Sequence, residues 1–82
     1  MRYRLFISDK ARGQLRALPK EWRGNIGRRM ELMRDDLQGD VKKLESRSNR
    51  HRLRVGSFRV LFTLENDLIS VYAVKDRKEA YG

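Results

Sequence analysis

Apolar and polar residues alternate at the start of the chain. From residue 2 to residue 7 every second residue is apolar, which is the period of a strand with one buried face. The inward set of such a strand is Tyr3, Leu5 and Ile7, and the outward set is Arg2, Arg4 and Phe6. Ser8 and Asp9 then offer an N-cap for a short helix. The apolar residues at helical spacing in that helix are Ala11, Leu15 and Leu18.

A longer apolar stripe predicts a second helix over residues 19–37. Its members are Trp22, Ile26, Met30, Met33 and Leu37. Pro19 suits the first turn of this helix, because a proline there loses no intrahelical hydrogen bond. Gly39 stands where a left-handed residue is expected to end the helix. We expect most of the stripe to pack in the core, with a partner-binding groove as the alternative.

Three further strands are predicted over residues 50–55, 58–64 and 68–74. Gly56-Ser57 and Asn66-Asp67 are two-residue turns of the kind that join antiparallel strands. Residues 41–44 are expected to anchor the connection that leads from the second helix to these strands. The pattern therefore predicts an α+β fold in the order β-α-α-β-β-β, with an antiparallel sheet that carries both helices on one face. The length of 82 residues fits one domain spanning 1–82.

The hairpin of the second and third predicted strands gathers arginines. If Gly56 and Ser57 form its turn, Arg54 lies opposite Arg59, and Arg52 shares their face because strand side chains alternate. Like charges opposite each other destabilise a sheet, and no acidic residue stands between positions 46 and 64. A locally unfavourable arrangement that no nearby residue offsets tends to mark a functional site. The alternative is that these arginines are ordinary surface residues.

The charge of the whole chain points to the same kind of partner. Its net charge is +9, and self-repulsion of that size in a small protein favours a polyanionic or acidic partner. Arginine suits phosphate because its planar fork donates two hydrogen bonds to it. Nucleic acid is therefore the first candidate and an acidic protein the second. An anionic membrane is disfavoured because the helical segments carry mixed charges. Further residues expected to bind such a polyanionic partner are Arg47, Arg50, Lys75 and Lys78.

Composition excludes several other classes of site. The chain has no cysteine, which excludes disulfides and thiolate metal sites. Asp35 and Asp36 diverge on the predicted helix, so no carboxylate metal site is expected, and no phosphate-binding loop or nucleophile elbow is present. No apolar run approaches the ~20 residues that span a bilayer. We expect a cytoplasmic protein that uses neither a metal nor a small-molecule cofactor.

The second half of the chain resembles the RelE/ParE toxin superfamily. The resemblance rests on the stretch HRLRVGSFRVLFTLENDLISVYAVKDRKEAYG, which has a basic-apolar-basic strand, a glycine turn, an aromatic-Arg-Val-Leu-Phe strand, an acidic turn and a basic ending with a tyrosine. The segment DVKKLES and the order of elements extend it over nearly the whole chain. It implies a toxin that is neutralised by a cognate antitoxin. RelE-type members are metal-independent endoribonucleases that cut messenger RNA, usually on the ribosome, with the 2′-hydroxyl of the RNA as nucleophile.

The resemblance also implies the site residues. The catalytic positions of the family fall on Arg52, Arg54, Arg59, Arg77 and Tyr81, with Lys75 as the alternative to Arg77. RelE-type members often carry lysine at the first two of these positions. Arginine, with a pKa above ~12, does not accept a proton, so these side chains stabilise charge but do not deprotonate the 2′-hydroxyl. The candidate bases are Tyr81, Lys75, His51 and Glu45, and in-line positioning without a base is the alternative. By strand parity, His51 is expected to pack inward.

Two other functions stay open. A ParE-type inhibitor of DNA gyrase has the same fold, and the basic cluster argues against it because such inhibitors do not depend on that cluster. A catalytically decayed module that binds RNA or an antitoxin is the second, and the replacement of lysine by Arg52 and Arg54 supports it.

Overall fold

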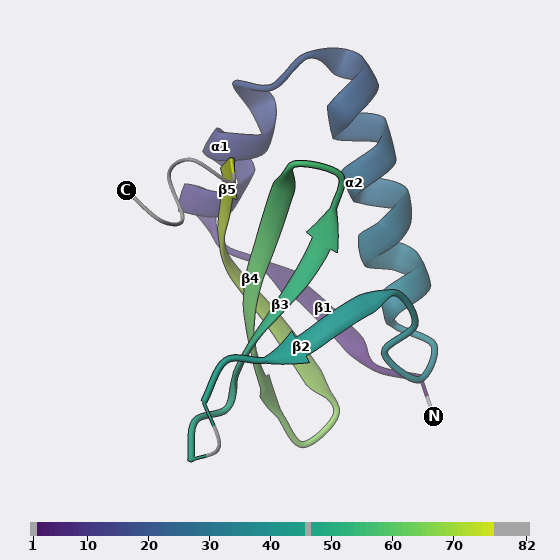
Figure 1. The fold of residues 1–82 in the computed structure, drawn as a ribbon, viewed down its shortest axis with the longest axis vertical. Coiled ribbons are helices and arrows are strands. Elements are labelled where there is room, and N and C mark those ends of the chain that lie inside the picture. The colour runs from purple at the N-terminus through teal and green to yellow at the C-terminus, as the bar shows by residue number, and fades with distance from the viewer. Residues whose placement is uncertain (1, 46, 77–82) are drawn as a thin grey trace.

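The computed structural model describes residues 2–45 and 47–76. Its elements are β1 (Arg4–Ile7), α1 (Asp9–Arg16), α2 (Lys20–Met33), β2 (Asp40–Lys43), β3 (Arg50–Val55), β4 (Phe58–Glu65) and β5 (Leu68–Asp76). The five strands form one twisted sheet in the order β1-β5-β4-β3-β2, with α2 running alongside it (Figure 1). The predicted α+β class and the order of its elements are confirmed. None of the described helices is long and apolar enough to cross a bilayer.

The structure adds one strand to the predicted order. The sequence pattern predicts only a docking segment after α2, whereas Asp40–Lys43 pairs with β3 as an edge strand that places Val41 opposite Leu53. β1 pairs in parallel with β5, and the other pairs are antiparallel. A parallel pair needs a long crossover, which the intervening helices and strands provide. The sheet is therefore mostly antiparallel, whereas the sequence predicts a sheet that is antiparallel throughout.

The first helix begins where the sequence predicts. Ser8 is its N-cap, and its Oγ accepts a hydrogen bond of 3.1 Å from the backbone N–H of Ala11. This bond satisfies one of the N–H groups that the first turn of a helix leaves without a partner. Ala11 itself is fully buried, so the cap and the first core contact fix the start of α1 together.

The second helix ends earlier than the predicted residue 37. Its last residue is Met33, and Arg34 is held by the N-terminal segment instead of continuing the helix. The backbone N–H of Tyr3 donates to the carbonyl of Arg34 at 2.8 Å, and Arg34 Nε donates to the carbonyl of Tyr3 at 3.0 Å. Asp36 and Leu37 then adopt left-handed φ values of 55° and 57°. The chain therefore reverses before Gly39, although Leu37 still packs against the core.

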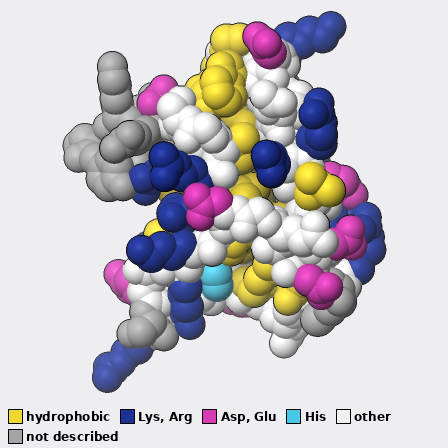
Figure 2. Space-filling model, turned by 45° about the vertical axis from the view of Figure 1, so that its right-hand side comes forward, with side chains coloured by type: hydrophobic (Ala, Val, Ile, Leu, Met, Phe, Trp, Pro, Cys, Tyr) yellow, Lys and Arg dark blue, Asp and Glu magenta, His cyan; other side chains and the backbone are white. Residues whose placement is uncertain are grey.

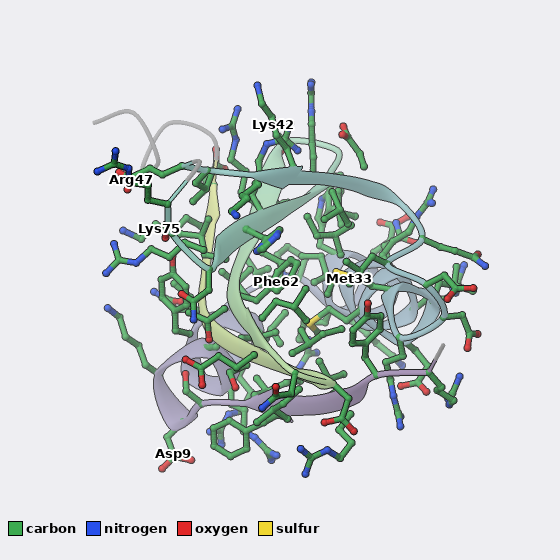
Figure 3. All side chains as sticks on the ribbon, turned by 90° about the horizontal axis from the view of Figure 1, so that it is seen from below. Asp9, Met33, Lys42, Arg47, Phe62 and Lys75 are labelled. Atoms are coloured by element: carbon green, nitrogen blue, oxygen red, sulfur yellow. The ribbon has the colours of Figure 1, made fainter. Side chains whose placement is uncertain are left out.

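The hydrophobic core lies between the sheet and α2. Phe62 of β4 and Met33 of α2 both point into this space (Figure 3). Ile26 and Met30 are also buried, which confirms that most of the apolar stripe is core. Trp22 is half-buried, and its ring packs on Phe58 with the centroids 4.9 Å apart.

Candidate nucleic-acid interface

The turn of the β3–β4 hairpin fixes the register of the candidate arginines. Val55 pairs with Phe58 across the turn, which agrees with the two-residue connection predicted from the sequence. Gly56 has a φ of 59°, which glycine adopts without steric cost. A Cβ at this position would lie 2.8 Å from the ring of Trp22. Both the backbone conformation and the tryptophan therefore require glycine at the turn.

The three strand arginines share the outer face of the sheet, as the sequence predicts. Arg54 pairs directly with Arg59, and Arg52 lies two residues before Arg54 on the same strand. Leu53 and Val55, which alternate with them on β3, are buried against the helices. Because successive strand side chains point to opposite faces, the arginines point away from the core.

The positive charge continues across the next strand. Lys75 of β5 pairs with Arg59, so that Arg54, Arg59 and Lys75 form one line across three neighbouring strands. We call these three residues the basic row. Figure 3 shows Lys75 on the side of the sheet away from Met33, that is, on the outer face. The strand pairings alone bring the row together, although its ends are 21 residues apart in the chain.

Arg52 has a carboxylate beside it, that of Asp40, the residue of β2 that pairs with Arg54. Its Nη1 lies 3.5 Å from Asp40 Oδ1 and donates a hydrogen bond of 3.1 Å to the carbonyl of Asp40. Only 14% of the Arg52 side chain is exposed. The sequence-based expectation that no arginine of the cluster has acidic compensation is therefore wrong for Arg52. The compensating residue comes from β2, the strand that the sequence analysis does not predict.

Arg54 is the most open member of the cluster. It is exposed, and its Nε donates a long hydrogen bond of 3.5 Å to the carbonyl of Gly56. Among residues 2–45 and 47–76, no carboxylate forms an ion pair with Arg54. Arg59 is half-buried between Arg54 and Lys75. The guanidinium of Arg54 is therefore accessible to an anion from solvent.

Two more of the predicted RNA-binding residues flank this cluster. Arg50 is exposed on the same face, opposite Thr63 of β4. Arg47 is exposed in the loop before β3, and Figure 3 shows it projecting on the same side as Lys75. Figure 2 shows another side of the molecule, where Lys and Arg side chains, with acidic ones among them, lie beside the histidine of β3. The predicted residues Arg77, Lys78 and Tyr81 lie outside the part of the chain that the structure describes.

The described candidates for a general base are separated by the sheet. His51 stacks on Phe62, with the ring centroids 5.3 Å apart and the planes 16° from parallel, which confirms its predicted inward packing. Its Nδ1 lies 2.9 Å from the carbonyl of Asn49. His51 therefore faces away from the basic row, whereas Lys75 belongs to it. Glu45 is exposed in the loop after β2.

The described residues also include no cluster of three or more His, Asp or Glu side chains able to hold a metal ion.

Comparison with solved structures shows the fold family. The chain is similar to the RelB–RelE antitoxin–toxin complex from Methanococcus jannaschii, with a TM-score of 0.78 and 25% identity over 93% of this chain and 94% of that chain. The archaeal RelE–RelB complex from Pyrococcus horikoshii OT3 matches with a TM-score of 0.78 and 25% identity over 94% and 97%. The intact Escherichia coli RelBE toxin–antitoxin complex matches with a TM-score of 0.73 and 16% identity over 90% and 95%. No protein-family model and no curated protein sequence matches the chain.

Proposed function

We propose that this protein, which has the RelE-like toxin fold, is the toxin of a toxin–antitoxin pair and a metal-independent endoribonuclease that cuts messenger RNA on the ribosome. The observation that carries the proposal is the direct pairing of Arg54 with Arg59 on the outer face of the sheet, extended by Lys75. Like charges paired in this way destabilise a sheet. A bound phosphate backbone offsets that effect, because each phosphate brings negative charge to the row.

The chemistry that fits this site is attack by the 2′-hydroxyl of the RNA on its own phosphate. The 2′-oxygen forms a bond to phosphorus, and the bond from phosphorus to the 5′-oxygen breaks. The proton lost by the 2′-hydroxyl is balanced by the proton that the leaving 5′-oxygen takes up. Negative charge grows on the phosphate oxygens in the transition state, where fixed guanidinium groups are most effective. Arginine can donate two parallel hydrogen bonds to those oxygens.

We assign different roles to the arginines according to their surroundings. Arg54 is open to solvent and is the first contact for the phosphate. Arg52 is tethered by Asp40, so its guanidinium is already oriented before RNA arrives. Arg59 lies between the two other charges of the basic row and completes the anion site. Arg77 and Tyr81 remain predicted catalytic residues.

Removal of the 2′-hydroxyl proton is the step for which arginine is unsuited. Lys75 is the described candidate base that shares the face of the basic row, and Tyr81 is the other predicted candidate. The alternative is that no general base acts, and that the arginines accelerate the reaction by holding the 2′-hydroxyl in line with the bond that breaks.

We also propose a cognate antitoxin as the protein partner. The similar solved structures are complexes of RelE with RelB, and the net charge of +9 suits a partner with acidic segments. The proposed site of action is the cytoplasm, where translated messenger RNA is found. A non-catalytic RNA-binding module is the second candidate, and the arginines at positions 52 and 54 favour it because they replace the family's lysines.

Induction of the protein in cells, followed by mapping of RNA ends, tests the proposal. We expect new ends within translated messenger RNAs, and none when Arg54 and Arg59 are replaced by alanine. Intact messenger RNA during active translation contradicts the endoribonuclease. Intact RNA with gyrase-dependent DNA breaks would identify a ParE-type inhibitor, and tight salt-sensitive RNA binding without cleavage would identify the non-catalytic module.

A further inference from the structure

A second feature of the outer face lies beside the arginines. Phe6 of β1 is 57% exposed and is the most exposed of the large apolar side chains in the described residues. It belongs to the outward set of its strand, whereas its neighbours Leu5 and Ile7 pack against the core. Strand pairing already orders the backbone of Phe6. Binding of a ligand to this side chain therefore costs little conformational entropy.

Strand pairing places this phenylalanine in line with one of the predicted RNA-binding arginines. Arg50 pairs with Thr63, Thr63 with Ser70, and Ser70 with Phe6. The four residues form one row across β3, β4, β5 and β1. Along β3 this row lies four residues from Arg54, which is about 13 Å at the rise of a strand. It therefore runs along the same face as the basic row, with the Arg52–Leu61 pair between the two.

A second aromatic residue lies beside this row, because Tyr72 follows Ser70 by two residues and therefore points to the same face. Leu61 pairs with Ala73 and Phe62 pairs with Val71, which leaves Tyr72 as the extra residue of β5. The bulge leaves Tyr72 without a paired residue on β4. Tyr72 lines the same groove as Phe6, while Val71 remains buried.

Together these side chains form a shallow groove of about 240 Å³, which we call the aromatic groove. Its main lining residues are Phe6, Arg50, Thr63, Ser70 and Tyr72. The two aromatic rings offer flat apolar surfaces, and the hydroxyl groups of Thr63, Ser70 and Tyr72 offer hydrogen-bond donors and acceptors. Among the residues that the structure describes, no carboxylate forms an ion pair with Arg50. Its positive charge is therefore open to an anion.

We propose that the aromatic groove binds one unstacked base of the same RNA strand whose phosphate the basic row holds. The inference rests on the proposed function and adds a subsite to it. A base presents a flat face for Phe6 or Tyr72 and polar edges for Thr63 and Ser70, and its phosphate lies within reach of Arg50. An apolar side chain of a protein partner fits less well, because it would leave the hydroxyl groups of Thr63 and Ser70 without partners.

Binding of a short RNA that is 2′-O-methylated throughout separates recognition from cleavage. We expect Phe6→Ala to weaken binding about tenfold, the typical effect of removing one base-stacking aromatic residue. Phe6→Tyr keeps the ring and should bind as the wild type does. Leu32→Ala, which truncates another exposed apolar side chain on α2, is the control and should change nothing. Thermal unfolding of each variant checks that its fold is intact.

An abasic site in the RNA identifies the contact directly. If the groove holds a base, one abasic position should weaken wild-type binding and remove the difference between wild type and Phe6→Ala, as expected for two partners of one contact. RNA binding that depends on Arg54 and Arg59 but is unchanged by Phe6→Ala would overturn the groove and leave the proposed function standing. If Phe6→Ala weakened binding of the antitoxin but not of RNA, the groove would belong to the protein partner, and its proposed role in binding a base would be overturned as well. RNA binding that is insensitive to both arginines would overturn the groove and the proposed function together.

Discussion

Arg54 and Arg59 lie directly opposite each other on the outer face of the β3–β4 hairpin, and Lys75 continues their line on β5. Directly opposed like charges oppose strand pairing by roughly 0.2–1 kcal/mol. Asp40 of β2 pairs with Arg54 in the strand register, but its carboxylate forms an ion pair with Arg52. The fold therefore places two positive charges opposite each other where a phosphate could contact both.

Replacing Arg54 or Arg59 by alanine should abolish RNA cleavage without unfolding the protein. We expect the free energy of unfolding to stay unchanged or to rise by a few tenths of a kcal/mol, because the repulsion between the two is removed. RNA-end mapping and urea unfolding measure the two effects. Arg23→Ala, which removes an exposed arginine from α2, is the charge-matched control and should leave cleavage intact. Unchanged toxicity in both hairpin variants would rule out this site.

The same two variants should change the salt dependence of RNA binding. Each phosphate contact that is lost lowers the slope of log affinity against log salt concentration by roughly one. We therefore expect a shallower slope for Arg54→Ala and Arg59→Ala, measured with 2′-O-methylated RNA so that cleavage does not interfere. Arg23→Ala should keep the wild-type slope. Equal slopes for all three variants would mean that the basic row makes no phosphate contact.

Asp40→Asn tests whether the carboxylate beside Arg52 competes with RNA. The substitution removes a negative charge 3.5 Å from the guanidinium. Exposed ion pairs are worth up to about 1 kcal/mol, so RNA affinity should rise by at most about fivefold. Asp9→Asn makes the same change of charge at the start of α1, far from Lys42 of β2 in Figure 3, and should have a smaller effect. An affinity that falls for Asp40→Asn would show that orienting Arg52 matters more than competition.

The hairpin was predictable because its signals are local. Gly56 and Ser57 mark the turn, and the period of two along each strand then places Arg54 opposite Arg59. The edge strand β2 carries a much weaker signal. Val41 is the single apolar residue of Asp40–Lys43, so no alternation reveals a strand. The carboxylate beside Arg52 was missed for the same reason.

The remaining differences arise from contacts between distant parts of the chain. Leu37 continues the apolar stripe of α2, but the hydrogen bonds between Tyr3 and Arg34 end the helix first. Likewise, the bulge at Tyr72 and the pairing of Phe6 with Ser70 depend on strands that meet only in the folded sheet. A local pattern contains no information about these partners. The arginine face was therefore visible in the sequence, and the aromatic groove was not.

Gly24→Ala should stabilise the protein. Gly24 lies in the interior of α2, its φ is not left-handed, and an added Cβ would meet no atom within 4 Å. Alanine is favoured over glycine in a helix interior by roughly 0.5–1 kcal/mol, and the free energy of unfolding should rise by that amount. Urea unfolding measures it, and an unchanged m-value would show that the effect is on stability itself. A destabilised variant would show that this part of α2 packs more tightly than the structure indicates.

Gly56→Ala makes the same chemical change with the opposite expected result. The φ of 59° costs a residue with a Cβ roughly 1–2 kcal/mol, and the new Cβ would meet the ring of Trp22 at 2.8 Å. We expect a loss of at least that size in the free energy of unfolding. Cleavage should fall as well, because the turn sets the register of Arg54 and Arg59. Gly24→Ala is the matched control, and equal stability of the two variants would contradict this account of the turn.

The ion pair between Arg4 and Asp67 predicts an acid-sensitive part of the stability. Arg4 Nη2 lies 2.8 Å from Asp67 Oδ1, and Nε donates to both carboxylate oxygens at 3.1 and 3.2 Å, which fastens β1 to the β4–β5 turn. These hydrogen bonds, together with the positive charge of Arg4, lower the pKa of the Asp67 carboxyl in the folded protein. The stabilisation is therefore complete above the unfolded pKa of about 3.9 and disappears as the pH falls through the lower folded pKa. Asp67→Asn should be less stable than wild type in urea at pH 7, by an amount that shrinks in high salt. Below the folded pKa the two should converge, and a difference that persists there would show that the asparagine acts through the turn backbone and not through the lost charge.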